Sequence, residues 1–152
     1  MLVSDLIEKK IKEKLNDGLS ASNISRISFM LGWDDTQEIK GEEEITQGII
    51  TIKANLPTFE TPTIPDSQIE TEINFVSRTD ADYQGKNYLA VSELIYNQIL
   101  NYQKSFSNVE TDFAFDNFTP TGFRISASDY GVDRENGTWI LSVSVIIYGI
   151  HS

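Results

Sequence analysis

The segment from Thr138 to Ile150 constrains the fold more than any other part of this sequence. Every second residue in it is apolar, as in a β-strand that buries one face; these residues are Trp139, Leu141, Val143, Val145 and Ile147. The intervening positions change from apolar to polar and back, through Ile140, Ser142, Ser144, Ile146, Tyr148 and Ile150. One domain core needs only the first face. The second apolar group, Ile146, Tyr148 and Ile150, is therefore expected to contact a helix of the same chain or another subunit, which favours an assembly component over an enzyme.

Two helices are predicted from apolar residues at helical spacing. The first spans residues 3 to 16, with Ser4 as its N-cap and Gly18 in the stop signal that follows. Its solvent side is predicted to carry Lys9, Lys10, Lys12, Lys14, Glu8 and Glu13. The second helix spans residues 86 to 104 and buries Tyr88, Val91, Ile95, Ile99 and Tyr102.

Alternating apolar residues predict strands at 27–33, 50–56, 69–75, 109–116, 123–127 and 138–150. A turn-rich connection is expected from 129 to 137. Strands grouped before and after one long helix favour an α+β fold. We predict one domain over residues 1–152, with a single, mostly antiparallel sheet of about six strands and both helices packed on one side of it.

Two loops are predicted between the early strands. The first, 34–48, is strongly acidic and carries Asp34, Asp35, Glu38, Glu42, Glu43 and Glu44. Its spacing fits no EF-hand, so a solvated charge run is favoured over a calcium site. The second, 57–68, holds three prolines and several threonines and is expected to stay outside the central ladder. Loops of this length are usually functional or disordered.

Charge and composition exclude several classes of protein. The net charge is −11, so the chain is a poor candidate for wrapping nucleic acid, which needs excess Lys and Arg. It suits a passage through which DNA slides without sticking, although acidity that only keeps the chain in solution is the simpler interpretation. There is no cysteine, and no apolar run predicts a signal peptide or a membrane span.

Catalytic and cofactor motifs are absent from the sequence. The one histidine, His151, stands beside the terminus, where a flexible tail would hold a catalytic base poorly. Asp112 with Asp116, or Asp80 with Asp82, formally offers paired carboxylates, but these are better interpreted as solvated strand-edge and cap residues. We predict no enzyme, no cofactor and no metal site.

Aromatic residues gather in the last third of the chain, namely Phe113, Phe115, Phe118, Phe123, Tyr130 and Trp139. Such a cluster is usually core, and a base-stacking platform would need basic neighbours. The alternative function is therefore a small-ligand or carbohydrate-binding α+β module that uses these aromatics.

Three segments resemble the tail terminator, or tail-completion, proteins of long-tailed bacteriophages, a group that includes minor capsid and head–tail joining proteins. They are the lysine-bearing helix DLIEKKIKEKL, the strand and helix INFVSRTDADYQGKNYLAVSELIYNQILNY, and the closing strand RENGTWILSVSVIIYGI. The resemblance covers most of the chain. It implies a homo-oligomeric ring, commonly a hexamer, that caps the tail tube and then meets the neck.

The resemblance also implies partners and contact residues. The partners would be further copies of the chain, the tail tube protein and the neck or connector protein, while DNA passes through the ring without specific binding. The protein would be assembled in the host cytoplasm and reside in the virion, with no membrane contact. Ile146, Tyr148 and Ile150 would face the next subunit. Tube, neck or lumen contacts would come from the two loops, through Asp34, Asp35, Glu42, Glu43, Glu44, Thr58 and Phe59. These loops are longer than the shortest family members need, so a related neck or tube-end protein is the alternative within this group.

Overall fold

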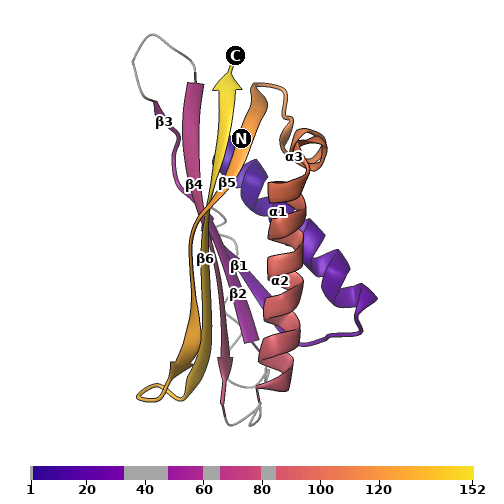
Figure 1. Ribbon diagram of the computed structural model, residues 1–152, viewed down its shortest axis with the longest axis vertical. Helices are drawn as coiled ribbons and strands as arrows, with labels where there is room; N and C mark the ends of the chain where they lie inside the picture. The colour runs from indigo at the N-terminus through magenta and orange to yellow at the C-terminus, as the bar shows by residue number, and fades with distance from the viewer. Residues whose placement is uncertain (1, 33–47, 60–65, 80–84) are drawn as a thin grey trace.

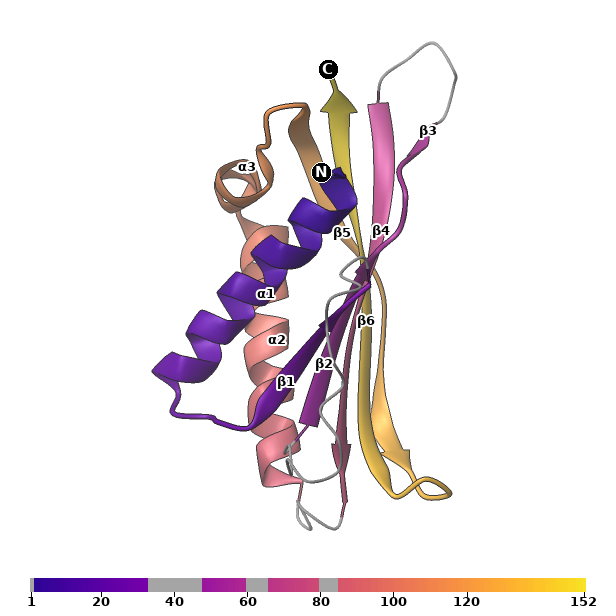
Figure 2. The same cartoon turned by 180° about the vertical axis from the view of Figure 1, so that it is seen from behind.

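The computed structural model describes residues 2–32, 48–59, 66–79 and 85–152. These residues form two layers, a sheet and a group of helices that all lie on one of its faces (Figures 1 and 2). The helices are α1 (Val3–Ala21), α2 (Lys86–Lys104) and α3 (Phe106–Phe113). The strands are β1 (Ile27–Leu31), β2 (Gly48–Ala54), β3 (Thr58–Phe59), β4 (Asp66–Arg78), β5 (Phe118–Asp133) and β6 (Thr138–His151).

The sheet has six strands in the order β1-β2-β4-β6-β5, with β3 paired to β4 beyond the end of β2. Only β1 and β2 run parallel, and the remaining pairs are antiparallel. The predicted α+β class, with a mostly antiparallel sheet and helices on one side, is confirmed. None of the described helices has the length and apolar composition needed to cross a bilayer.

The alternating apolar residues of β6 and β4 show on which face of the sheet the core lies. In β6 the side chains of Leu141, Val143, Val145 and Ile147 are fully buried, as their alternation predicts. In β4 the residues Ile69, Ile73 and Phe75 face the same side. The helices cover the other side of the core with two stripes of buried residues. These are Ile7, Ile11, Leu15 and Leu19 of α1 and Tyr88, Val91, Ile95, Ile99 and Tyr102 of α2.

Helix α1 is longer than predicted, because it continues through the expected stop at Gly18 to Ala21. Gly18 serves close packing instead of a left-handed cap. A Cβ at this position would lie 3.2 Å from the Leu94 side chain of α2, so the missing side chain lets the two helices approach.

Two polar residues of α1 were assigned wrongly from the sequence. Ser4 is not the N-cap, since it lies inside the helix, which begins at Val3 with Leu2 as its N-cap. Its hydroxyl is buried and donates to the carbonyl of Asn55 at 2.6 Å. Glu8 is not on the solvent side: its side chain is fully buried and accepts the N–H of Ala54 at 2.8 Å. These contacts, one turn apart, tie α1 to the end of β2.

The predicted strand at 109–116 is instead helix α3 and the turn after it. Phe113 and Phe115 alternate, but Val109 and Phe113 also stand four residues apart, so the same side chains fit a helical face. Val109 and Phe113 are fully buried, and the Phe113 ring packs on Tyr102 with 4.9 Å between ring centroids. Tertiary packing selected the helical arrangement.

Strands β4 and β5 are longer than predicted, and β3 was not predicted. Strand β5 runs without a break through the region expected to be turn-rich, and the turn is confined to residues 134–137. The expected loop at 57–68 contains β3 and the first residues of β4. Residues 33–47, which include Trp33 of the first predicted strand and nearly all of the acidic loop, lie outside the described residues, as do 60–65.

Candidate functional site

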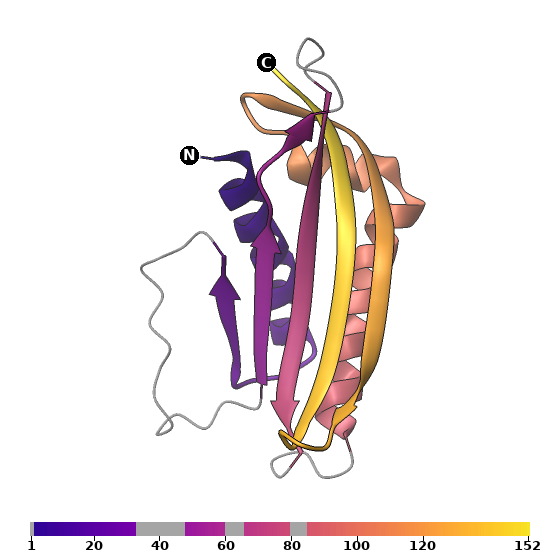
Figure 3. The same ribbon diagram turned by 90° about the vertical axis from the view of Figure 1, so that its left-hand side faces the viewer.

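The face of the sheet opposite the helices is open. Figure 3 shows it toward the viewer, with the helices behind it. In the described part of the chain nothing is stacked on this face, and its side chains are half-buried or exposed where those of the other face are fully buried. An open sheet face is ordinary in antiparallel sheets when its side chains are polar. Here part of it is apolar.

The apolar part is the group predicted from the last strand. Ile146, Tyr148 and Ile150 all project from the open face of β6, and Ile150 is 38% exposed. We call these three residues the apolar patch. No helix among the described residues covers it, so this part of the structure leaves the patch open to a second molecule.

Polar and charged residues of the two neighbouring strands border the patch. On β4, Asp66, Gln68 and Glu70 lie directly opposite Ile150, Tyr148 and Ile146. On β5, Thr119 and Arg124 lie opposite Ile150 and Ile146. An apolar centre with a polar border that carries both signs of charge is the usual composition of a protein–protein interface.

Tyr148 has a structural role within the patch. It lies opposite Gly122 of β5, and a Cβ on that glycine would stand 3.3 Å from Cδ2 of the Tyr148 ring. The ring therefore covers the backbone where β5 has no side chain, an arrangement that compensates for glycine in an edge strand. Replacing Tyr148 would disturb β5 as well as any interface, so Ile146 is the better position for a test.

A shallow hollow of about 400 Å³ lies beside the patch. Its lining comes from three strands and consists of Asp66, Ser67, Gln68, Thr121, Tyr148 and Ile150. The sequence analysis missed Asp66 and Gln68 because it assigned them to a loop. The hollow is wide and open, and its polar groups do not converge on one point, which suits an inserted side chain better than a small ligand.

The residues predicted to contact tube, neck or lumen are only partly described. Asp34, Asp35, Glu42, Glu43 and Glu44 fall outside the described residues. Thr58 and Phe59 are exposed on β3. Thr58 pairs with Gln68, on the open face, whereas Phe59 pairs with buried Ser67 and lies on the helix side. They therefore do not form one surface.

His151 is an ordered residue of β6, which corrects its placement on a flexible tail. Its Nε2 lies 2.6 Å from the hydroxyl of Ser67, and its ring packs against Phe118 and Phe59 at centroid distances of 5.0 and 5.4 Å. Burial lowers the pKa of the imidazole. The histidine thus serves as a neutral, packed side chain.

We expect His151 to make stability depend on pH. Because the pKa is lower in the folded state than the unfolded value near about 6.5, the unfolded chain binds more protons once pH falls below that value. The contribution of the neutral His151 to folding stability is therefore present above this pH and is lost as the pH falls toward the folded pKa. Chemical denaturation at pH 7.5 and pH 5 would compare the chain with His151→Gln. The original chain should lose more stability on acidification, and an equal loss in both would contradict the assignment.

Asp112 is buried on α3, which corrects its assignment as a solvated strand-edge residue. It accepts a hydrogen bond from the Tyr102 hydroxyl at 2.6 Å and lies 3.6 Å from the Lys14 ammonium. Burial and the contact with Asp112 raise the pKa of Tyr102, which keeps its hydroxyl protonated and donating. One carboxylate thereby joins α1, α2 and α3.

A paired-carboxylate site finds no support among the described residues. Asp116 is exposed beyond the end of α3, while Asp112 is committed to Tyr102 and Lys14. Asp80 and Asp82 lie outside the described part of the chain. Within that part, no three His, Asp or Glu side chains gather closely enough to hold a metal ion.

Most of the aromatic cluster belongs to the core. Phe113 and Phe118 are fully buried, and Phe115, Phe123 and Trp139 pack against the core with part of their surface exposed. Tyr130 differs, because it is 74% exposed near the far end of β5. These aromatics do not form a common platform, and no observation favours the ligand-binding alternative.

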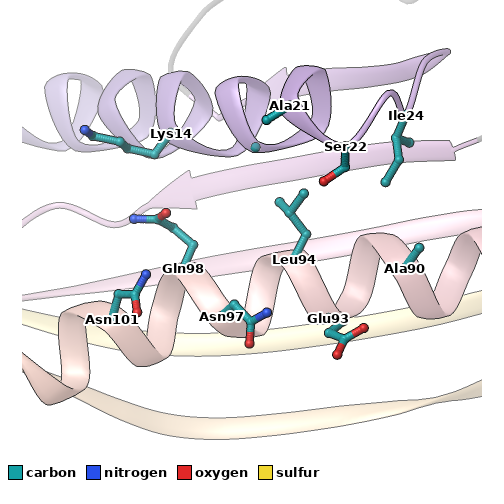
Figure 4. Close-up of a pocket in the computed structure, with 11 residues that line it drawn as sticks. Lys14, Ala21, Ser22, Ile24, Ala90, Glu93, Leu94, Asn97, Gln98 and Asn101 are labelled. Carbon is teal, nitrogen blue, oxygen red and sulfur yellow. The ribbon is translucent and has the colours of Figure 1, made fainter.

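The helical layer also has a groove, of about 510 Å³, between α1 and α2. Figure 4 shows Leu94 and Gln98 of α2 pointing toward α1 across it, whereas Glu93 and Asn97 point away. Small residues of α1 and the turn after it, Gly18, Ala21 and Ser22, form the opposite wall. The lining mixes apolar and amide groups with one basic and one acidic residue, Lys14 and Glu93. Lys14 already pairs with Asp112, so the described lining presents no cluster of charged or metal-binding side chains.

No protein-family model matches this sequence, and a comparison with curated proteins also finds no relative. The open face of the sheet therefore has to be interpreted from its own geometry.

Proposed function

We propose that this chain is a structural protein of a bacteriophage or phage-like tail. It forms a ring at the head-proximal end of the tail, caps the tube and joins it to the neck. The observation that supports this most is the apolar patch, which three helices of the same chain leave uncovered because they all pack on the other face (Figure 3). Exposed apolar residues with a polar border are typical of protein–protein interaction sites.

The two-layer shape supports a ring. One side of the molecule is helical and the other is an open sheet, so the surface offered at one side differs from the surface offered at the other (Figures 1 and 2). Contacts between unlike surfaces repeat head to tail, and they close into a ring when the rotation between subunits allows it. A hexamer is the expected closed form.

The charge supports a passage for DNA. With a net charge of −11, the ring would repel the phosphate backbone instead of binding it. The acidic residues between 34 and 48 would line this passage or face the tube or neck. The partners of the ring are thus the tail tube protein, the neck or connector protein and transient DNA, and the location is the virion.

We infer a role without catalysis and without a cofactor. His151 is bonded to Ser67 and packed between two phenylalanine rings. Asp112 is held by Tyr102 and Lys14. Among the described residues, His151 and Asp112 are thus both held in structural contacts.

Replacing Ile146 tests the ring. We expect Ile146→Lys to weaken assembly about tenfold or more, because it places a hydrated charge within the patch. Ser144→Lys is the matched control: it adds the same charge two residues away on the same face, outside the patch, and each lysine would lie opposite a glutamate of β4. Light scattering after size-exclusion chromatography, and electron microscopy of tail tubes incubated with each variant, measure assembly.

Two outcomes would contradict the proposal. In one, the chain stays monomeric at every concentration and does not bind tube ends. In the other, the Ile146 and Ser144 variants assemble equally well. Tail-tube and connector genes beside this reading frame would support the proposal independently of any assembly measurement.

A further inference from the structure

Strand β5 is the last strand on its side of the sheet, where its outer backbone groups meet no further strand among the described residues. An edge of this kind is a template for another β-strand, and proteins usually protect it with prolines, bulges, charges or a covering segment. The two halves of β5 differ in this respect.

The first half of β5 is protected. Pro120 removes one backbone donor, and the pairing with β6 shifts register twice, between Pro120 and Gly122 and between Ile125 and Ala127. The side-chain oxygen of Gln103, on α2, also accepts the N–H of Ile125 at 3.0 Å. Another strand therefore cannot pair with residues 118–125.

The second half, residues 127–133, lacks the proline, the register shifts and the covering side chain of the first half, and its charged residues are Asp129 and Asp133. It is called the open edge below. It pairs with β6 in unbroken register and contains neither proline nor lysine. Two of its larger side chains lie in solvent, since Tyr130 is 74% exposed and Val132 is 42% exposed. Gly131 lies opposite Ile140 on the open face of the sheet, where a Cβ would meet nothing within 4 Å, so no described side chain crowds the face at this point of the strand.

We propose that the open edge pairs antiparallel with the open edge of a second copy of this chain, across a two-fold axis at Tyr130. The result is one sheet continuous through both copies. Each Tyr130 lies directly opposite its counterpart, an aromatic cross-strand pair of the kind that stabilises antiparallel sheets.

The charges select this register. With the axis at Tyr130, Asp129 faces Gly131 of the second copy, Asp133 faces Ala127, and the whole open edge is used. Moving the axis to Gly131 places Asp129 opposite Asp133, and moving it to Asp129 places that carboxylate opposite itself. Like charges directly opposite each other destabilise a pair of strands. Only the axis at Tyr130 combines full length with no carboxylate facing another.

The two-fold contact is distinct from the ring contact. A two-fold axis joins subunits in opposite directions, whereas a polar ring joins them head to tail. The first uses the edge of β5 and the second uses the open face around Ile146. The edge contact thus describes a dimer of the protein before it assembles on the tail, and loss of the ring contact alone, as in Ile146→Lys, would leave it unaffected.

Lysine substitution tests the dimer. Tyr130→Lys removes the aromatic pair and sets two positive charges opposite each other, so we expect the dissociation constant of the dimer to rise about tenfold. The matched control is Leu89→Lys, which replaces an apolar side chain that is 62% exposed and belongs to helix α2 instead of the sheet. Sedimentation equilibrium of the original chain and both variants gives the constants. Equal constants for all three would overturn the proposal.

A single cysteine provides a second, geometric test, because the chain has none of its own. Opposite residues of antiparallel strands have Cα atoms about 4.5–5.5 Å apart, within the range of a disulfide. Tyr130→Cys should therefore form a disulfide-linked dimer under mild oxidation much faster than Leu89→Cys. Reduction should return both cysteine variants to the form without a disulfide. A rate no higher than that of the Leu89 variant would overturn the proposed axis.

Discussion

Replacing Gly149 with alanine should lower the free energy of unfolding by about 3 kcal/mol. Gly149 lies in β6 beside the ring of Phe118, and a Cβ added there would stand 2.1 Å from Cζ of that ring. The ring is fully buried, so it has no free space into which it can move. For a chain of this length the midpoint of thermal unfolding should fall by about 6–12 °C.

Gly131→Ala is the control for this prediction. It makes the same change in another strand of the sheet, at a site where the new methyl group meets nothing within 4 Å. We expect it to change stability by less than about 0.5 kcal/mol. Calorimetry and urea unfolding measure both variants, and equal effects would show that the conflict with Phe118 does not arise.

Replacing the Phe118 ring with a smaller side chain should relieve the conflict. In a chain that already carries Phe118→Leu, the added cost of Gly149→Ala should be at least about 1 kcal/mol smaller. A fully additive double variant would contradict direct contact between the two positions.

Replacing Glu8 with alanine should be the second large effect, at about 3 kcal/mol of lost stability. The buried carboxylate accepts the N–H of Ala54, and that backbone group has no exposed surface from which to reach water. The substitution removes this acceptor and also empties the space that the side chain fills. Together with the bond from Ser4 to Asn55, Glu8 fixes α1 on the end of β2.

Two variants distinguish the loss of the hydrogen bond from the loss of the charge and from a general effect of replacing glutamate in α1. Glu8→Gln keeps an acceptor of the same shape and should cost about 1 kcal/mol or less. Glu13→Ala removes an exposed glutamate of the same helix, paired only with Lys10 at 3.5 Å, and should change stability by less than about 0.5 kcal/mol. Equal losses for Glu8→Ala and Glu13→Ala in urea unfolding would show that Glu8 does not anchor the helix.

The elements predicted correctly from sequence share a cause. In β6, in the later part of β4 and in α2, apolar residues repeat at the period of the element over several turns or pleats, and the buried residues are the ones that the pattern marks. The apolar patch also followed from local pattern, since Ile146, Tyr148 and Ile150 exceed what one core requires. Its identity as an interface remains a proposal.

The elements predicted wrongly share a different cause. Val109 and Phe113 fit a helix and a strand equally well, and contact with Tyr102 of α2 decides between them. Ser4 and Glu8 are residues that normally face solvent, and they are buried because the backbone of Ala54 and Asn55 offers partners. Asp66 and Gln68 followed prolines, yet they extend β4 because β6 continues beside them.

The sequence by itself determined the class of fold, the two main apolar stripes and the two-sided character of the last strand. Each of these depends on a repeat of apolar residues that can be recognised within one short segment of the chain. Only the tertiary structure decided which face stays open, which half of β5 is protected and which polar groups are buried. These features depend on residues far apart in the chain, such as Gln103 with Ile125 and Gly149 with Phe118, and no local period records such contacts.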